Sequence, residues 1–433
     1  MPIFLLHCIN IFSIMKKIFT ILACAGMVLF AAGCGEDDPP YVPGTGQEGG
    51  ESGGTQVDWE TWEKDGTMAK RGVSDSLDIS CSMFEGKPIS VKYDALENRL
   101  VHVIYYVPSL TGVKDMPILF AMHGAERVGG TMINAFKPFA DRYGFILVVP
   151  QFLRSSDITK KNETTKEYVF SEEMRARYNG VSFWPENDYQ FGGVTTSKTS
   201  GEIRDKSLWT YPVIEAIFEY VRNETGNLSR GYYMFGHSAG GQFVNRMVMA
   251  YPEARIIKCV AANPSSWAWP SVEGMIVNPN PTVDDKITSC ESPWPYTVKG
   301  LYSDISGLSK PFAKRMLVQV GTADMETSSL DQSNQAMAQG YRRYPRGRNF
   351  YQVCQAVAAA GKITCNFKFA EVEGAGHGTY AMLYGLSSGR SSSRISYDQL
   401  GSSAAFTFLF RGVLSERSDS EETEETEEIE DLY

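Results

Sequence analysis

The sequence of 433 residues lacks the patterns that would indicate metal or nucleic-acid binding. It contains no C-x-x-C motif and no cluster of cysteine with histidine, so a zinc site is not predicted. It has no basic stripe interleaved with aromatic residues, which argues against a nucleic-acid partner. Histidine is scarce as well, with five in the whole chain, and this scarcity narrows the choice of any catalytic base.

Charge is unevenly distributed along the chain. The net charge is −10, and residues 415–431 contain ten acidic side chains against one arginine. We therefore expect residues 414–433 to form a disordered acidic tail, because like charges repel one another. The overall composition, 43% hydrophobic and 21% charged, is typical of a globular protein and excludes a collagen-like fibre or a multi-span membrane protein.

The N-terminal residues have the parts of an export signal. Met15 is followed by two lysines, an apolar stretch over residues 18–30, small residues at 31–33, and Cys34. The apolar stretch is shorter than the ~20 residues that a transmembrane helix needs. The pattern resembles a bacterial lipoprotein signal, which implies a start at Met15, cleavage before Cys34 and lipidation of its thiol. An uncleaved membrane anchor is the alternative.

The acidic residues at 36–38 resemble a surface-export signal of some lipoproteins. We therefore expect an exported lipoprotein of the outer membrane, attached through its lipid, on either the periplasmic or the surface face. Residues 35–58 are rich in Gly, Pro, Ser and Glu and are expected to form a flexible linker. Residues 59–413 remain for the catalytic domain.

Five cysteines fall within that domain. An exported protein can form disulfides, but an odd number leaves at least one thiol free or paired outside the chain. Two bridges are possible, and their pairing cannot be deduced from spacing. The five are Cys81, Cys259, Cys290, Cys354 and Cys365.

Strands and helices are predicted to alternate along the domain. Several of the predicted strands are apolar on both faces. We therefore predict an α/β fold with a mainly parallel central sheet flanked by helices. Residues 101–107 are expected to add an antiparallel edge strand. Two long polar segments, 151–206 and 263–308, are expected to form loop insertions over the active site. The predicted strands are 117–122, 145–149, 232–235, 256–261, 316–320 and 367–372, and the predicted helices are 208–222, 240–251, 350–360 and 403–409.

The most specific motif is G-x-S-x-G at residues 236–240. It follows an apolar strand and precedes an amphipathic helix, which is the setting of a nucleophile elbow. Gly236 and Gly240 provide the small neighbours that so tight a turn requires. The pattern predicts Ser238 as a nucleophile and the backbone N–H of Ala239 as a donor to a developing oxyanion.

A serine hydroxyl needs a general base, and elimination selects one histidine. In the order serine, acid, histidine that accompanies this elbow, only His377 follows the serine. The acid should lie between them at the end of a strand, and Asp324 follows the predicted strand 316–320 after the short stretch 321–323. The other candidates for the acid are Asp284, Asp285, Asp304 and Asp331.

The second oxyanion donor should come from a loop that follows an early strand. The His123-Gly124 pair after residues 117–122 predicts the backbone N–H of Ala125 in that role, with His123 beside the substrate. Trp267 and Trp269 begin the second insertion, where they are expected either to bind substrate or to pin the loop to the body.

These motifs resemble the α/β-hydrolase superfamily, in particular secreted esterases related to polyhydroxyalkanoate depolymerases and feruloyl or acetylxylan esterases. The resemblance covers most of residues 115–385, including the elbow and the segments 261–267, 320–324, 335–340 and 371–377. It implies the α/β-hydrolase fold and serine-ester hydrolysis without a cofactor, on a small or polymeric ester substrate. Peptide or amide cleavage, and glycan binding on an inactive hydrolase scaffold, are the alternatives.

Overall fold

The computed structural model describes residues 89–90, 100–108, 112–152, 159–161, 168–170, 184–198, 201–272, 292–385, 404–411 and 413–414. The predicted signal with Cys34, the linker, the acidic tail, and the thiols of Cys81 and Cys290 lie outside these residues. Within the described part, no helix is both long and apolar enough to span a membrane.

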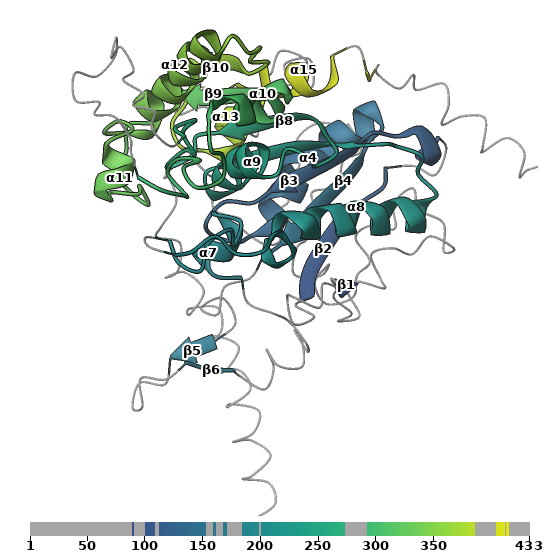
Figure 1. Ribbon diagram of the computed structural model, residues 1–433. Coiled ribbons are helices and arrows are strands. Elements are labelled where there is room, and N and C mark those ends of the chain that lie inside the picture. Colours follow the sequence, from purple (N-terminus) through teal and green to yellow (C-terminus); the bar gives the residue numbers. More distant parts are fainter. Residues whose placement is uncertain are drawn as a thin grey trace, which may run out of the picture. The chain divides into compact units, whose positions relative to one another are not determined.

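An eight-stranded sheet with the order β1-β2-β4-β3-β7-β8-β9-β10 forms the centre of the domain (Figure 1). Neighbouring strands from β4 to β10 are all parallel, whereas β2 runs antiparallel to both β1 and β4. The predicted mainly parallel sheet is confirmed. The strands are β1 (Ile89–Ser90), β2 (Leu100–Tyr106), β3 (Ile118–Met122), β4 (Ile146–Gln151), β7 (Tyr232–His237), β8 (Ile256–Ala262), β9 (Met316–Gly321) and β10 (Lys368–Val372).

Both faces of the sheet are buried, which explains the continuous apolar runs. In β3, Ile118 and Phe120 belong to one hydrophobic cluster, and Leu119 and Ala121 belong to the other. Successive side chains of a strand point to opposite faces, so β3 contributes to two cores. A strand with two buried faces gains from apolar residues at every position, as the sequence has them.

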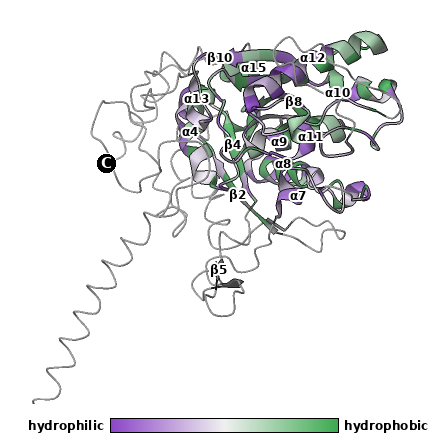
Figure 2. Cartoon of the chain, turned by 90° about the vertical axis from the view of Figure 1, so that its left-hand side faces the viewer, coloured by the Kyte–Doolittle hydropathy of each residue, from purple (hydrophilic) through white to green (hydrophobic). Residues whose placement is uncertain are grey.

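Helices cover each face. The first cluster contains side chains of α8, α9 and α12, and the second contains side chains of α4, α13 and α15. Accordingly, α4 and α13 lie on one side of strand β4, and α8 and α9 lie on the other (Figure 2). The bounds are α4 (Gly129–Tyr143), α7 (Glu186–Tyr189), α8 (Tyr211–Thr225), α9 (Ala239–Ala250), α10 (Ser309–Ala313), α11 (Asn334–Met337), α12 (Arg343–Gly361), α13 (Thr379–Tyr384) and α15 (Ala404–Phe410).

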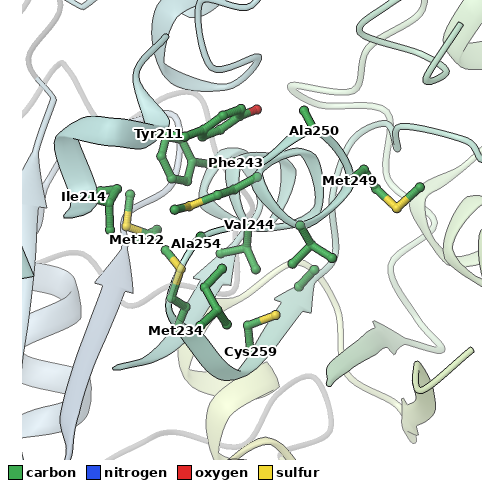
Figure 3. Close-up of a cluster of buried hydrophobic side chains, with 14 of the residues drawn as sticks. Met122, Tyr211, Ile214, Met234, Phe243, Val244, Met249, Ala250, Ala254 and Cys259 are labelled. Carbon is green, nitrogen blue, oxygen red and sulfur yellow. The ribbon is translucent and has the colours of Figure 1, made fainter. Parts of the chain in front are cut away.

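Helix α9, which follows the predicted nucleophile, is buried along its whole length. Phe243 and Val244 pack with Met122 of β3 and Met234 of β7 in the cluster beneath the helix (Figure 3). Tyr211 of α8 contacts Phe243 at 5.3 Å between ring centroids. Because α9 is fixed on all sides, the turn at its N-terminus is held rigidly.

Among the elements that differ from the sequence prediction are β2, α12 and α4. The antiparallel strand β2 is not the outermost strand, because the two-residue strand β1 pairs beyond it. Helix α12 begins seven residues earlier than predicted, at Arg343. Helix α4 was not predicted, since it opens with two glycines and contains Pro138, which are poor helix formers.

The described parts of the two insertions pack against each other and the body. The indole N–H of Trp294 donates to the carbonyl of Phe191 at 3.2 Å. The Arg246 guanidinium lies 4.7 Å from the ring of Phe191, and its Nε donates to the carbonyl of Pro295. A separate two-stranded ribbon, β5 (Thr159–Lys161) with β6 (Tyr168–Phe170), belongs to the first insertion.

The three described domain cysteines, Cys259, Cys354 and Cys365, are free thiols. No bridge therefore forms among the cysteines within the described residues. Burial raises the pKa of the Cys259 and Cys354 thiols, so both behave as small apolar core residues.

Candidate active site

Ser238 occupies a sharp turn between β7 and α9. Its backbone has φ 56° and ψ −117°, a strained conformation for a residue with a side chain. A Cβ on Gly236 would lie 2.2 Å from the carbonyl oxygen of Gly240, and one on Gly240 would lie 2.1 Å from that of Met122. Both positions therefore require glycine.

The structure brings Ser238, His377 and Asp324 together from three separate strand ends. His377 Nε2 lies 2.9 Å from Ser238 Oγ, and His377 Nδ1 lies 2.7 Å from Asp324 Oδ2. All three side chains are buried, with exposed fractions of 5% or less. With the carboxylate ionised, Nδ1–H donates to Asp324, which leaves Nε2 as an acceptor facing the serine hydroxyl.

The loops that carry Asp324 and His377 are joined by backbone hydrogen bonds. Ala323 N–H donates to the carbonyl of Ala375 at 2.9 Å, and Gly374 N–H donates to Thr322 Oγ1 at 2.7 Å. A Cβ on Gly321 would lie 2.4 Å from the Ala375 oxygen, so glycine permits this close approach. The acid and the imidazole are thus held as one unit.

Asn263 braces this unit from the end of β8. It is fully buried and has a left-handed φ of 45°, a conformation that asparagine tolerates better than most residues. Its Nδ2 donates to the carbonyl of Gly376 at 3.2 Å, and its Oδ1 accepts from Gly321 N–H at 2.9 Å. Asn263 therefore fixes the residue before His377 against the end of β9.

The other candidates for the catalytic acid do not contact His377 in the described part of the chain. Asp304 accepts from Ser306 N–H at 2.8 Å and caps a short 3₁₀ helix. Asp331 accepts from the hydroxyl of Tyr296 at 2.9 Å and pairs with Lys198 at 3.5 Å. Neither carboxylate contacts His377. Asp284 and Asp285 lie outside the described residues.

His237 packs beside His377, with ring centroids 4.7 Å apart. Its Nδ1 lies 2.9 Å from Thr379 Oγ1, which ties the end of β7 to the start of α13. Burial, together with the nearby His377 and Arg343, holds the pKa of His237 well below its usual range. His237 is therefore neutral at neutral pH.

This depressed pKa predicts acid instability. Below about pH 6.5 the unfolded chain binds a proton at residue 237 that the folded chain does not, so folding stability falls by up to about 1.4 kcal/mol per pH unit. We expect His237→Gln to lose less stability than the wild type between pH 7 and pH 5. Chemical denaturation at both pH values measures this; parallel losses in the two proteins would contradict it.

Gly124 lies next to the serine, since a Cβ at that position would be 3.9 Å from Ser238 Cβ. Arg127, with a left-handed φ of 60°, fixes the turn that follows. Its guanidinium donates to the carbonyl of Phe152 at 2.5 Å and lies 4.2 Å from the Tyr189 ring centroid. Of the two predicted oxyanion donors, Ala125 is half-buried next to Gly124 and Ala239 is the first residue of α9; their role as donors stays a prediction.

The hydrogen bonds of His123 favour a structural role, while its predicted place beside the substrate stays a prediction. The imidazole is fully buried, and its Nε2 accepts from Phe152 N–H at 3.0 Å while Nδ1 donates to the carbonyl of Gly124 at 3.0 Å. Tyr189 donates its hydroxyl to the His123 carbonyl at 2.7 Å. His123 thus braces the strand end that carries Gly124, because both ring nitrogens bind backbone groups.

Trp267 and Trp269 pin the second insertion to the body and do not line a substrate surface. Neither side chain has exposed area. Trp267 stacks on Phe350 of α12 with centroids 4.5 Å apart, and its backbone N–H donates to Gln339 Oε1 at 2.9 Å. Of the two interpretations that the sequence allowed, the buried rings favour packing.

Packing predicts that Trp267→Ala destabilises the fold by about 3–5 kcal/mol, the usual effect of deleting a buried aromatic side chain. The KM of the folded enzyme should change little. Urea denaturation together with ester kinetics checks both quantities. A large rise in KM with unchanged stability would restore the substrate-binding role.

The described residues contain no group of three or more His, Cys, Asp or Glu side chains arranged to hold a metal ion. The buried polar side chains around Ser238 are instead bonded to one another or to the backbone, as described for Asn263 and His123.

No family model and no curated protein matches the chain. Among solved structures it is similar to poly(aspartic acid) hydrolase-1 from Sphingomonas sp. KT-1, with 26% identity, a TM-score of 0.50, and coverage of 64% of this chain and 88% of that one. It is also similar to a poly(3-hydroxybutyrate) depolymerase from Bordetella parapertussis, with 24% identity, a TM-score of 0.52, and coverage of 75% and 89%.

Together with the sheet topology, these matches show that the chain has the α/β-hydrolase fold. These two structural neighbours are a poly(aspartic acid) hydrolase and a depolymerase, consistent with the group that the sequence motifs resemble. The similarity to these structures supports the interpretation that the chain is a hydrolase.

Proposed function

We propose that the protein is a serine hydrolase that cleaves carboxylic esters through an acyl-enzyme intermediate. One observation carries the proposal: hydrogen-bond distances continue from Asp324 through both nitrogens of His377 to Ser238 Oγ. A base in contact with the hydroxyl, itself oriented by a buried acid, is the arrangement that activates serine.

In the proposed reaction, Ser238 Oγ attacks the ester carbonyl while His377 Nε2 takes the hydroxyl proton. The tetrahedral oxyanion accepts hydrogen bonds from the backbone N–H groups of Ala125 and Ala239, the second of which also lies at the positive end of the α9 dipole. His377 then protonates the departing alcohol. In the second half of the reaction, His377 takes a proton from a water molecule as the water attacks the acyl carbonyl. Ser238 Oγ then leaves and regains its proton from His377, which restores the serine.

The role of Asp324 is to fix the tautomer. Because its carboxylate accepts the Nδ1 proton, the basic lone pair of His377 must lie on Nε2, toward the serine. The carboxylate also stabilises the imidazolium that forms during attack. Both contributions depend on its complete burial, where a charge interacts more strongly than it does in water.

For the substrate, we propose a polymeric or polysaccharide-linked ester. The solved neighbours carry the names of a poly(aspartic acid) hydrolase and a poly(3-hydroxybutyrate) depolymerase, both enzymes of polymers. The two polar insertions are the parts of the chain that would contact such a polymer. We propose further that Cys34 is lipidated and holds the domain at the outer membrane, where polymers too large to enter the cell are accessible.

Hydrolysis of matched model substrates tests the function. The wild-type protein should release p-nitrophenol from p-nitrophenyl acetate, and the activity should disappear in Ser238→Ala. The corresponding p-nitroanilide separates ester from amide cleavage. Turnover of the anilide but not the ester would replace this proposal with amide hydrolysis, and turnover of neither would leave a binding scaffold.

A further inference from the structure

A buried arginine lies behind the proposed catalytic acid. Arg343 is the first residue of α12, and its side chain has no exposed area. Its Nη1 lies 3.4 Å from Asp324 Oδ1, while Oδ2 of the same carboxylate faces His377 Nδ1 at 2.7 Å. The two carboxylate oxygens are thus divided between a base and a permanent cation.

Arg343 also holds the loop that follows the acid. Its Nη2 donates to the carbonyl of Ser328 at 2.7 Å, and its Nη1 lies 3.4 Å from the carbonyl of Glu326. These carbonyls are neutral, so they satisfy donors of the guanidinium without cancelling its charge. The contact with Asp324 therefore joins two opposite charges at a site without water access.

We propose that Arg343 is a positioning residue that holds Asp324 in its orientation and offsets part of the negative charge that Asp324 places beside His377. The inference rests on the proposed serine-hydrolase function. It adds a fourth side chain, which touches neither substrate nor the reacting atoms.

Three groups from three different elements surround the imidazole of His377. Asp324 lies after β9, His237 at the end of β7 and Arg343 at the start of α12, and His237 is neutral. A buried carboxylate without a partner strongly favours the imidazolium form, which cannot act as a base. A guanidinium on its far oxygen weakens that preference, because a second cation near the imidazole opposes protonation.

A pH–rate profile of kcat/KM tests this. Arg343→Gln removes the charge but keeps an amide donor for the Ser328 carbonyl, whereas Arg343→Lys keeps the charge. We expect the acidic limb of the profile to move upward by about one pH unit in Arg343→Gln and to stay near the wild-type position in Arg343→Lys. In Arg343→Gln at neutral pH, kcat should fall with little change in KM.

Arg346, one turn along α12, provides the matched control. It is also fully buried and bonds the carbonyls of Gly340 and Ser265, but no contact joins it to Asp324. Arg346→Gln should lower stability without moving the acidic limb. An unmoved limb in folded Arg343→Gln, or an equal movement in Arg346→Gln, would overturn the inference. Failure of the proposed function is distinguishable, because the wild type would then show no serine-dependent turnover.

Discussion

Replacing Ser238 by alanine is expected to lower kcat for an ester substrate by about 10⁶, the effect of removing the nucleophile from a triad in other serine hydrolases. The alanine fits the strained turn no worse than serine, because the side chain only becomes smaller. The folded structure and its thermal unfolding should therefore be nearly unchanged. Steady-state kinetics and circular dichroism measure the two quantities.

Residues that act as a unit give non-additive losses. The double variant Ser238→Ala/His377→Ala should be about as slow as either single variant, because the loss of one member leaves the other unable to contribute to catalysis. A double variant slower by the product of the two single effects would mean that the side chains act independently, contrary to the hydrogen-bond chain observed between them.

Asp324→Asn should lower kcat by about 10⁴ with little change in KM. The amide has nearly the same shape, but its NH₂ group can face Nδ1 of His377, which favours the tautomer with its proton on Nε2. That tautomer cannot accept the serine proton. Kinetics at neutral pH measures the loss.

Asp331→Asn is the control for this change. Asp331 is likewise a hydrogen-bonded carboxylate, although it is only partly buried, and it contacts Tyr296 and Lys198 rather than His377. Lys198, with hydrogen bonds from Ser333 and Tyr296, lowers the pKa of Asp331 despite its burial. Its replacement should affect stability more than turnover. A larger loss of kcat in Asp331→Asn than in Asp324→Asn would contradict the assignment of the acid.

The elbow and the sheet could be predicted because their signals are local. A strand with two buried faces is apolar at every position, and Gly236 and Gly240 are needed by a turn that spans five residues. The placement of Asp324 and His377 could be anticipated for a related reason, since parallel strands bring their carboxyl ends to one edge.

Contacts between distant segments could not be predicted in this way. Asn263 bonds Gly376, which lies 113 residues away in the sequence, and no spacing rule connects them. The pairing of Arg343 with Asp324 depends on where α12 begins, and its apolar pattern emerges only several residues later. The pattern of apolar residues could not say whether Trp267 faces the core or solvent, because aromatic rings are common in both settings.

Labelling with a fluorophosphonate tests whether Ser238 is an activated nucleophile, since this electrophile reacts with an activated serine and requires no knowledge of the natural ester. We expect a single covalent adduct on the wild-type protein, mapped by peptide mass spectrometry to Ser238, slow labelling of His377→Ala, and no labelling of Ser238→Ala. Equal labelling of wild type and Ser238→Ala, or no labelling of the folded wild type, would contradict it.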